Sequence, residues 1–456
     1  MAKKQVSAAA PAPANRPPYM LIEEIRVQGY KSLVDAKITV RPLTLLAGTN
    51  SSGKSSIMQP LLLIKQTMEA FYQPAGALVL DGAHVQAETA DELVSKAGKK
   101  LNYSFSIQTN ITGVAEGKER SYHLVVEYAL SGLSFKVKKQ EFWNEGKKGK
   151  SIVLTPFSTS SDILSQGRKL GQARDYVGAD SKIKRRNGFL QYDMTNEVGV
   201  VTGTMWHSYA LELVLAKLAH IPGLRGKPQR SYIPTFFEGD IRGTFDLYAA
   251  GTVSQWQEQQ DAEKLAKLND YLRRLGLTDS VTAKVKNANE VELSVSRLPA
   301  GSKGKPRKAD MVNIADVGIG VSQVLPILVA LIAAQEGQIV YVEQPELHLH
   351  PRAQVAMAEL LAEAANRGVR VIVETHSSLL LLTVQTLIAQ SRIKNTDVAL
   401  HWFARDAKGA TQVTYVEPDE DGAYGEWPED FGDVELKAQD AYLTAVGLRH
   451  FGNAAN

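Results

Sequence analysis

The hydrophobic pattern is clearest at the two ends of the chain. Near the N-terminus, "MLIEEIRVQGYKSL" and "DAKITV" are typical of short strands, and "PLTLLAG" of a third, buried strand. The next segment has apolar residues at helical spacing, at Ile57, Leu61, Ile64 and Met68. We therefore expect order to begin near Met20 and to pass from strands into a helix.

From Met311 onward, strand and helix patterns alternate. A long apolar helix that contains "VLPILVALIAA" precedes the strand "GQIVYVE", and the helix "RAQVAMAELLAEAANRG" precedes the strand "VRVIVETH". Another helix and the strand "DVALHWFA" follow. Such alternation predicts an α/β fold with helices on both faces of the sheet and the functional site at the carboxyl ends of its strands.

The middle of the chain, residues 78–309, is harder to interpret. "NYSFSIQTN" and "SYHLVVEYAL" indicate antiparallel strands, whereas "SYALELVLAKLAHI" and "EQQDAEKLAKLNDYLRRLGL" indicate helices. A basic, glycine-containing stretch at about residues 167–188 is expected to be a mobile loop, and residues 299–310 another loop. We find no heptad pattern long enough for a coiled-coil arm.

Composition excludes several classes of protein. The 456 residues contain no cysteine, which excludes disulfides and thiolate chemistry and fits a reducing cytoplasm. A net charge of +3 does not by itself indicate nucleic acid or a membrane surface. The longest apolar stretch is shorter than the roughly 18–20 residues of a membrane span. Residues 1–19 are rich in Ala and Pro and are expected to be a disordered tail.

The strongest chemical signal is "GTNSSGKS", from Gly48 to Ser55, which matches the phosphate-loop pattern G-x-x-x-x-G-K-[ST]. It stands between a buried strand and a helix, as that loop requires. Glycines let backbone N–H groups surround phosphate oxygens, and the helix N-terminus adds a positive dipole end. Lys54 is expected to reach the β- and γ-phosphates of ATP, and Ser55 to bind Mg²⁺.

A carboxylate, Glu343, ends the buried strand "IVYV", where it would hold Mg²⁺ beside Ser55. The next residue is Gln344, and an amide can position water but cannot accept its proton. Glu346, two residues further on, carries a carboxylate that could accept that proton. We therefore expect slow hydrolysis.

Two further segments carry candidate residues. In "DVGIGVSQVLP", a glycine-rich turn with Ser322 expected at the N-cap opens the long apolar helix. In "VIVETHSS", His376 follows a buried strand and could hydrogen-bond the γ-phosphate.

The order of these segments resembles ABC-type ATPases of the RecF, SMC and OLD group. "PLTLLAGTNSSGKSSIMQPLLLIKQTM", "ADVGIGVSQVLPILVAL" and "YVEQPELHLHPRAQVAMAELL" are similar to a compact bacterial subgroup of phage-defence operons, which includes PARIS- and Septu-type ATPases. "GEWPEDFGDVEL" resembles a tail segment of that subgroup. The resemblance covers residues 20–80 and 310–435 well and the middle only loosely.

The resemblance implies site residues. The phosphates and magnesium would be held by Gly48, Asn50, Ser52, Gly53, Lys54, Ser55 and Ser56, with Lys31 of "GYKSL" near the nucleotide. Gly318, Gly320 and Ser322 would meet the ATP of a second protomer, and Glu343, Gln344, Glu346 and His376 would serve hydrolysis. The implied domains are an N-terminal head part (20–77), an insertion (78–309), a C-terminal head part (310–405) and an extension (406–456).

The resemblance also implies a purpose. We expect an oligomeric scaffold and sensor in anti-phage defence, at least a head-to-tail dimer with room for a larger ring. A phage protein would trigger it, and a separately encoded Toprim- or HNH-type nuclease would be its effector, because the residues after His376 leave no space for a nuclease domain. The alternative is a RecF-like DNA clamp in repair, supported by basic residues at Arg168, Lys169, Arg174, Lys182, Lys184, Arg185 and Arg186.

Overall fold

The computed structural model describes most of the chain. It covers residues 19–72, 74–97, 103–115, 118–144, 151–169, 182–196, 198, 200–205, 207–236, 239–297, 310–425 and 440–446. The expected tail, most of the basic stretch and most of "GEWPEDFGDVEL" therefore lie outside the described residues.

A six-stranded sheet forms the centre of the molecule, in the order β11–β15–β16–β3–β17–β18. Its strands are β3 (Leu43–Gly48), β11 (Ala219–Ile221), β15 (Ile339–Glu343), β16 (Arg370–Thr375), β17 (Val398–Arg405) and β18 (Thr411–Val416). Neighbouring strands from β11 to β17 are parallel, and β18 is antiparallel to β17. The carboxyl ends of the parallel strands therefore meet along one edge.

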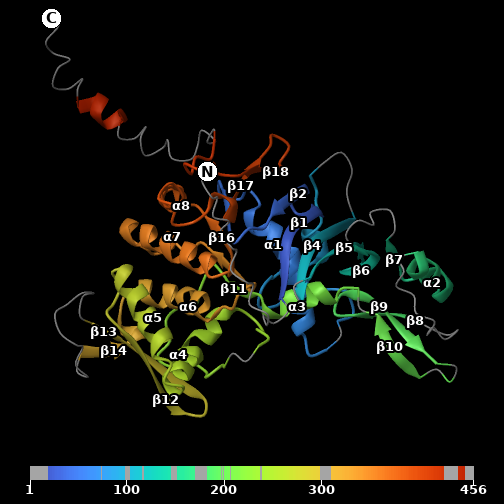
Figure 1. Cartoon of the computed structure of the whole chain (residues 1–456), viewed down its shortest axis with the longest axis horizontal. Coiled ribbons are helices and arrows are strands. Elements are labelled where there is room, and N and C mark those ends of the chain that lie inside the picture. The colour runs from blue at the N-terminus through green and yellow to red at the C-terminus, as the bar shows by residue number, and fades with distance from the viewer. Residues whose placement is uncertain are drawn as a thin grey trace, which may run out of the picture.

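The two faces of this sheet pack against different layers because successive residues of a strand point to opposite sides. In β3, Leu43 and Leu45 contribute to the core formed with α4 to α8, whereas Leu46 contributes to the core formed with α1 and α3. The helices are α1 (Lys54–Glu69), α3 (Tyr209–Lys217), α4 (Ala249–Glu258), α5 (Ala262–Arg274), α6 (Ile319–Ala333), α7 (Pro351–Asn366) and α8 (Ser378–Ala389). The predicted α/β architecture with helices on both faces is confirmed (Figure 1).

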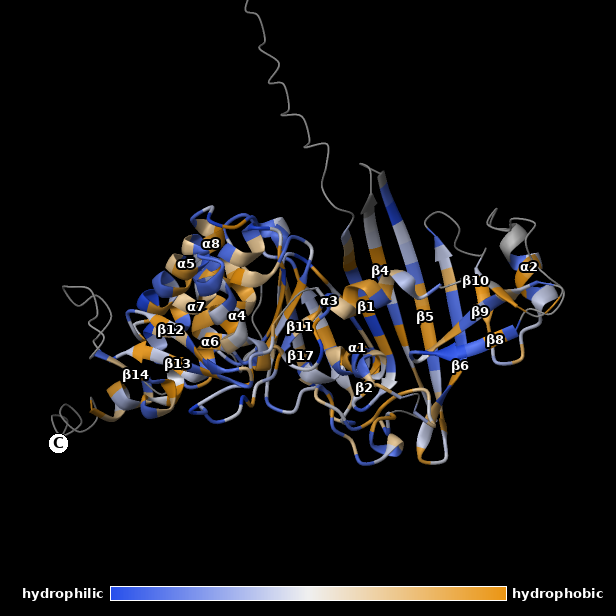
Figure 2. Cartoon of the chain, turned by 90° about the horizontal axis from the view of Figure 1, so that it is seen from below, coloured by the Kyte–Doolittle hydropathy of each residue, from blue (hydrophilic) through white to orange (hydrophobic). Residues whose placement is uncertain are grey.

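A second, antiparallel sheet lies beyond α1, with the order β2–β1–β4–β5–β6–β7. Its strands are β1 (Tyr19–Tyr30), β2 (Leu33–Thr39), β4 (Ser104–Ala115), β5 (Lys118–Ser131), β6 (Ser134–Asn144) and β7 (Ile152–Leu154). Hydrophobic and hydrophilic residues alternate along its long strands (Figure 2). Because β4 pairs with β1, the sequence expected to be an insertion extends a sheet that begins at the N-terminus.

Smaller elements complete the structure. They are α2 (Ser160–Lys169), the sheet β8 (Lys182–Arg186), β9 (Phe189–Thr195) and β10 (Val201–Met205), and the sheet β12 (Val281–Asn287), β13 (Glu290–Ser296) and β14 (Met311–Asn313). Short 3-10 turns are η1 (Ala90–Glu92), η2 (Phe245–Tyr248), η4 (Ile314–Asp316) and η5 (Asn395–Asp397).

Two predictions for the middle of the chain were wrong. The basic stretch was expected to be a loop, which is wrong for its described ends: these belong to α2 and β8, and β8 pairs along its length with the largely buried β9, whereas residues 170–181 lie outside the described residues. "SYALELVLAKLAHI" was expected to be one helix. Helix α3 ends at Lys217, because Ala219–Ile221 pairs with β15 at the edge of the central sheet.

None of the helices in the described part of the chain is long and apolar enough to span a membrane.

Candidate active site

The phosphate loop lies between β3 and α1, at the carboxyl edge of the central sheet, as predicted. Gly48 has φ 144°, and a Cβ built there would lie 2.1 Å from the carbonyl oxygen of Phe403. Gly53 is the N-cap of α1 with φ 98°, and a Cβ there would lie 2.6 Å from Thr411 Oγ1. Both glycines are therefore required by backbone conformation and by close approach of neighbouring strands.

Lys54 is buried inside this loop. Its Nζ donates hydrogen bonds to the carbonyl oxygens of Gly48 at 3.1 Å and Thr49 at 2.7 Å. Burial lowers the pKa of Lys54, while the nearby carboxylates of Glu374 and Glu346 favour its charged form. The ammonium is therefore placed where phosphate oxygens would replace carbonyl oxygens as its partners.

The loop has a support that the sequence did not reveal. Thr411, the first residue of β18, donates through Oγ1 to the carbonyl oxygen of Ser52 at 2.7 Å. Thr411 Oγ1 also lies 2.8 Å from the hydroxyl oxygen of Ser32. A threonine 359 residues from Ser52 in the chain carries no sequence signal of this role.

Glu343 is fixed at the end of β15 by two hydrogen bonds. Its Oε2 accepts from the backbone N–H of Gly223 at 3.0 Å, and its Oε1 lies 3.1 Å from His220 Nε2. Burial would raise the pKa of this carboxyl, but the contacts with His220 and Gly223 outweigh burial and lower it. Glu343 is thereby kept ionised, as a magnesium ligand must be.

His220 begins a chain of buried groups that leads away from Glu343. Its Nδ1 lies 3.0 Å from Nδ1 of His84, and Nε2 of His84 lies 3.2 Å from Glu69 Oε2. Lys65 forms an ion pair with the other oxygen of Glu69 at 2.9 Å. The contact between the two Nδ1 atoms needs a proton on one of them and a lone pair on the other, so the tautomers of the two rings are coupled.

A second buried carboxylate, Glu374, is the penultimate residue of β16. The phenol of Tyr341 donates to its Oε2 at 3.3 Å, and the hydroxyl of Ser55 is near enough to favour its ionised form. Burial, with the charge of Glu343, raises the pKa of Glu374. The structure thus brings a carboxylate to Ser55 that sequence analysis passed over, although it stands in the "VIVETHSS" segment.

Glu346 does point into the site. Its Oε1 accepts from the backbone N–H of His376 at 2.7 Å, and burial raises its pKa. Lys54 lies within electrostatic reach of it. Burial and the charge of Lys54 lower the pKa of His376, whereas the nearby backbone of Gly48 favours its protonated form. Both residues therefore lie beside the phosphate loop.

Gln344 is held in an unusual backbone conformation, with φ 46°. Its N–H donates to the carbonyl oxygen of Glu374 at 2.8 Å, and its own carbonyl oxygen accepts from Arg225 Nη2 at 3.0 Å. Its side chain and that of Glu343 lie beside Gly223, since a Cβ built there would be 3.6 Å from Gln344 Oε1 and 3.5 Å from Glu343 Oε2. A non-glycine residue with positive φ persists only where its surroundings over-determine it.

The remaining residues predicted to bind the nucleotide lie in the phosphate loop or in and beside α1. Ser52 is buried in the loop, Asn50 is exposed and Ser56 is half-buried in the first turn of α1. Lys31 lies against α1, where its Nζ donates to Gln59 Oε1 at 2.7 Å. Its relation to the nucleotide stays a prediction.

The glycine-rich turn caps α6 differently from the prediction. The N-cap is Gly318, whose φ of −56° and ψ of 147° start the helix at Ile319. Ser322 lies inside the first turn and donates to the carbonyl oxygen of Ile319 at 2.8 Å, so it was wrongly placed at the N-cap. Gly320 lies beside the "LHLHP" stretch, since a Cβ there would be 3.6 Å from the carbonyl oxygen of His348.

The donor set around Lys54 fits magnesium. Ser55 and the carboxylates Glu343 and Glu374 supply hard oxygen ligands, which Mg²⁺ prefers. Within the described part of the chain, no group of three or more His, Asp or Glu side chains could enclose a metal by itself. An ion here would complete its shell with water and phosphate oxygens, as Mg²⁺ does in nucleotide sites.

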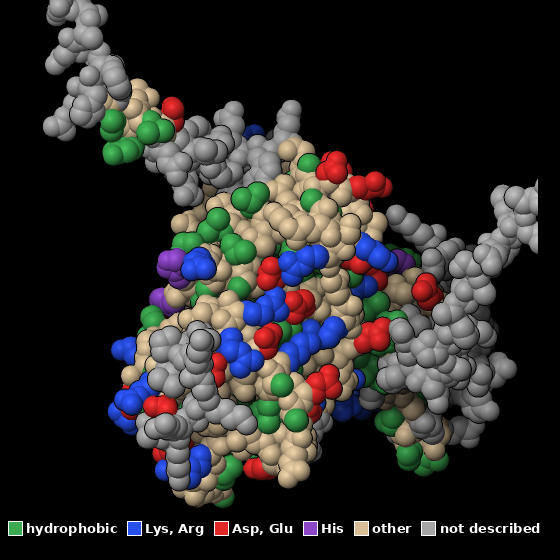
Figure 3. All heavy atoms as spheres, turned by 60° about the vertical axis from the view of Figure 1, so that its left-hand side comes forward, with side chains coloured by type: hydrophobic (Ala, Val, Ile, Leu, Met, Phe, Trp, Pro, Cys, Tyr) green, Lys and Arg blue, Asp and Glu red, His purple; other side chains and the backbone are tan. Residues whose placement is uncertain are grey.

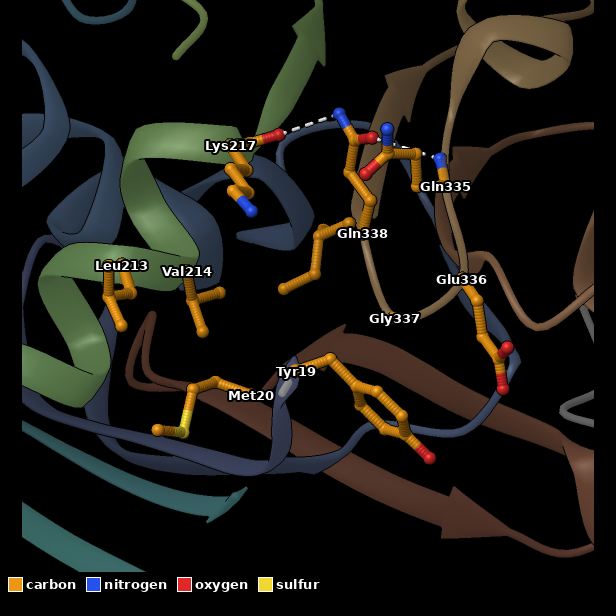
Figure 4. Close-up of a pocket in the computed structure, with 10 residues that line it drawn as sticks. Tyr19, Met20, Leu213, Val214, Lys217, Gln335, Glu336, Gly337 and Gln338 are labelled. Atoms are coloured by element: carbon orange, nitrogen blue, oxygen red, sulfur yellow. Dashed lines mark hydrogen bonds between the residues drawn. The ribbon is translucent and has the colours of Figure 1, made fainter. Parts of the chain in front are cut away.

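A separate cavity of about 360 Å³ opens near the other end of the parallel strands. Figure 4 shows Leu213 and Val214 of α3, Tyr19 and Met20 of β1, and Gln338 around it. Ile339, which lines it, begins β15, whereas the phosphate loop follows the end of β3. This cavity is therefore not part of the site.

Comparisons with known proteins agree with this description. An "AAA ATPase domain" family model matches residues 20–164, and a model described as "AAA domain, putative AbiEii toxin, Type IV TA system" matches residues 220–382. The search of curated proteins gives no match.

Among solved structures, the chain is similar to three heads of SMC proteins. An Smc head bound to the C-winged helix domain of ScpA is 12% identical over 87% of this chain and 98% of its own, with TM-score 0.45. An Smc head with an extended coiled coil, bound to the C-terminal domain of ScpA derived from Pyrococcus furiosus, is 12% identical over 88% and 97%, with TM-score 0.46. The SMC head domain from Thermotoga maritima is 11% identical over 87% and 99%, with TM-score 0.40.

The chain is an ATPase of P-loop fold, and both matching family models describe AAA domains. The family matches, the glycine-dependent loop around Lys54 and the carboxylates at the ends of β15 and β16 support the same class. Nucleotide and a divalent metal are the cofactors that this class requires.

Proposed function

We propose that this ATPase hydrolyses ATP slowly and that Glu346 is its general base. The observation that carries this proposal is the pair Gln344 and Glu346. Gln344 directly follows β15 and has an amide and a constrained backbone, whereas Glu346 turns back to the phosphate loop. A carboxyl group whose pKa is raised by burial is better matched to accept a proton near neutral pH.

Turnover by the purified chain tests this proposal, with Lys54→Ala as the blank. Glu346→Gln should lower kcat by about 10²-fold or more, the ordinary contribution of general-base assistance. Gln344→Glu supplies a second carboxylate and should raise kcat. Brisk turnover that Glu346→Gln leaves unchanged would exclude both parts of the proposal.

We further propose that ATP closes two chains head to tail. The first turn of α6 and the adjacent "LHLHP" stretch lie at one surface, on which Ile319 is 48% exposed, His348 is exposed and Ser322 is half-buried. If this surface meets the nucleotide of a second protomer, one chain cannot complete the site alone. ATP-dependent dimers should appear in sedimentation, and Ser322→Arg should abolish them without changing the affinity of one chain for ATP.

For its biological role, we propose a scaffold and sensor in anti-phage defence that controls a separately encoded Toprim- or HNH-type nuclease. The resemblance to defence ATPases and the toxin–antitoxin description of one matching family model support this role. The test is co-purification with a nuclease encoded beside it, in ATP and in ADP. Failure of the nuclease to associate in either state would exclude it.

A DNA clamp is the second candidate, because β8 is strongly basic. Its residues already have partners, however: Lys184 pairs with Asp193 at 3.0 Å, and Arg185 donates to the carbonyl oxygens of Pro74 and Ala75. On the face formed by α5 and α7, basic and acidic side chains are interspersed (Figure 3). Salt-dependent DNA binding that is lost on replacing Lys182, Lys184 and Arg186 by Gln would favour the clamp.

A further inference from the structure

Arg225 is a buried cation whose donors are mostly unused. It follows β11 in the loop that also contains Gly223, and the residue is 8% exposed. Its Nη2 donates to the carbonyl oxygen of Gln344 at 3.0 Å and lies 3.5 Å from that of Gly223. Its Nε and Nη1 have no hydrogen-bond partner among the described residues. Sequence analysis did not select this residue.

The charges around Arg225 act on it only through space. Asp246, Glu346 and Glu343 favour its charged form, and none of them is ion-paired with it in the described structure; Asp246 Oδ1 is likewise buried without a hydrogen-bond partner among the described residues. Burial lowers its pKa to about 10, so the guanidinium is still a cation at neutral pH. Buried donors without acceptors cost free energy, and natural proteins keep few of them.

The position of Arg225 relates it to the phosphate loop. Glu346 lies within electrostatic reach of both Arg225 and Lys54, and its Oε2 also has no partner among the described residues. Its other oxygen accepts from His376 N–H at 2.7 Å, and Lys54 and the backbone of Gly48 both act on the pKa of the His376 ring. Arg225 donates to the carbonyl oxygen of Gln344, and Gly223 of the same loop donates to Glu343, so Arg225 borders the residues expected around the terminal phosphate.

We propose that Arg225 is a phosphate-binding residue of this site, whose Nε and Nη1 donate to a terminal phosphate group. A guanidinium presents parallel N–H groups that match two oxygens of one phosphate. The ligand is the γ-phosphate of ATP before cleavage and inorganic phosphate after it. Because Nη2 holds Gln344 at the same time, the bound phosphate and the end of β15 are positioned by one side chain.

The proposal extends to α6 through Gln323. Its Nε2 donates to the carbonyl oxygens of Arg225 at 3.2 Å and Gly226 at 3.0 Å. The loop that would bind phosphate is thus tied to the first turns of the helix expected to meet a second protomer. This extension, unlike phosphate binding itself, rests on the proposed dimer.

The test compares affinities for ADP and ATP in the full chain, in the presence of Mg²⁺ and with Ser322→Arg in every variant to keep the chain monomeric. Arg225→Gln should weaken ATP binding at least 10-fold and ADP binding less than twofold. Arg225→Lys keeps the charge without the paired N–H groups and should be intermediate. Arg230→Gln is the matched control, since Arg230 is in the same loop region but forms an exposed ion pair with Asp316.

Two further titrations distinguish binding of the γ-phosphate from binding of inorganic phosphate. Beryllium fluoride should tighten ADP binding to the parent chain but not to Arg225→Gln, which reports the γ-phosphate position. Inorganic phosphate should likewise tighten ADP binding to the parent chain but not to Arg225→Gln, which reports binding of the product. Equal weakening of ADP and ATP would show a purely structural role and overturn the proposal, as would unchanged affinity for both. Neither result depends on turnover or dimer formation, so failure here is distinct from failure of the proposed function.

Discussion

The Nε2 atom of His220 lies 3.1 Å from Oε1 of Glu343, and the histidine is almost completely buried. A histidine that fixes the carboxylate expected to bind magnesium should affect metal affinity more than nucleotide affinity. Residues that orient a metal ligand typically contribute 10–100-fold to metal affinity.

We expect His220→Ala to raise the Mg²⁺ concentration needed for half-maximal turnover by about 10-fold or more. Magnesium titration of ATP hydrolysis measures this, and metal-free binding of ATP should stay nearly unchanged. His84→Ala provides a graded comparison, because it removes the support of His220 but leaves Glu343 untouched. An unchanged magnesium requirement in His220→Ala would remove the positioning role.

Thr411 should contribute to nucleotide affinity although it belongs to the C-terminal region. Thr411→Val leaves the buried carbonyl oxygen of Ser52 without its hydrogen bond, which costs about 1–3 kcal/mol. We expect ATP affinity to fall about 10-fold, measured with a fluorescent analogue. Thr414→Val, in an exposed position of the same strand, is the control and should bind normally.

Local patterns were enough to predict the central part of this fold. The buried strand before "GTNSSGKS" and the helix after it are short-range features, and so are the strand–helix alternation and the carboxylate after "IVYV". These features placed the phosphate loop, Glu343 and His376 on one edge of one sheet, and the structure has the same arrangement.

The parts that the sequence did not predict depend on contacts between distant segments. Thr411 and His220 acquire their roles only through strand pairing: β18 with β17, and β11 with β15. The helical pattern of "SYALELVLAKLAHI" hid β11, because an edge strand of three residues has no periodicity of its own. Arg225 was missed for the same reason, since its partner is a backbone carbonyl rather than a charged side chain.

The conformation of Gln344 gives a prediction of its own. Gln344→Gly removes the side chain and relieves the strain of φ 46°, which costs of order 1 kcal/mol in a non-glycine residue. If the amide only occupies the position of a missing base, kcat should change less than threefold. A fall of 10-fold or more would show that the amide itself positions the attacking water. Glu346→Gln, measured in parallel, gives the scale for loss of a general base.

Acid should destabilise the fold through two buried histidines. Burial lowers the pKa of His207 and of His401 to about 4, from an unfolded value near 6.5. The unfolded chain therefore binds more protons below pH 6.5, so stability is lost as pH falls from 6.5 toward 4. Between pH 7.5 and 5, each residue should cost about 2 kcal/mol of unfolding free energy.

Urea unfolding at several pH values measures this slope, and His207→Leu isolates one contribution. His207 packs against Phe142, and neither of its ring nitrogens has a hydrogen-bond partner within the described structure, so leucine removes the titration without breaking a bond. The variant should lose about 2 kcal/mol less than the parent chain between pH 7.5 and 5. His401 offers a contrast, because its Nε2 lies 2.8 Å from the carbonyl oxygen of Thr39 and its replacement also removes that contact. Parallel stability curves for His207→Leu and the parent would contradict this prediction, because they would show that folding does not lower the pKa of His207.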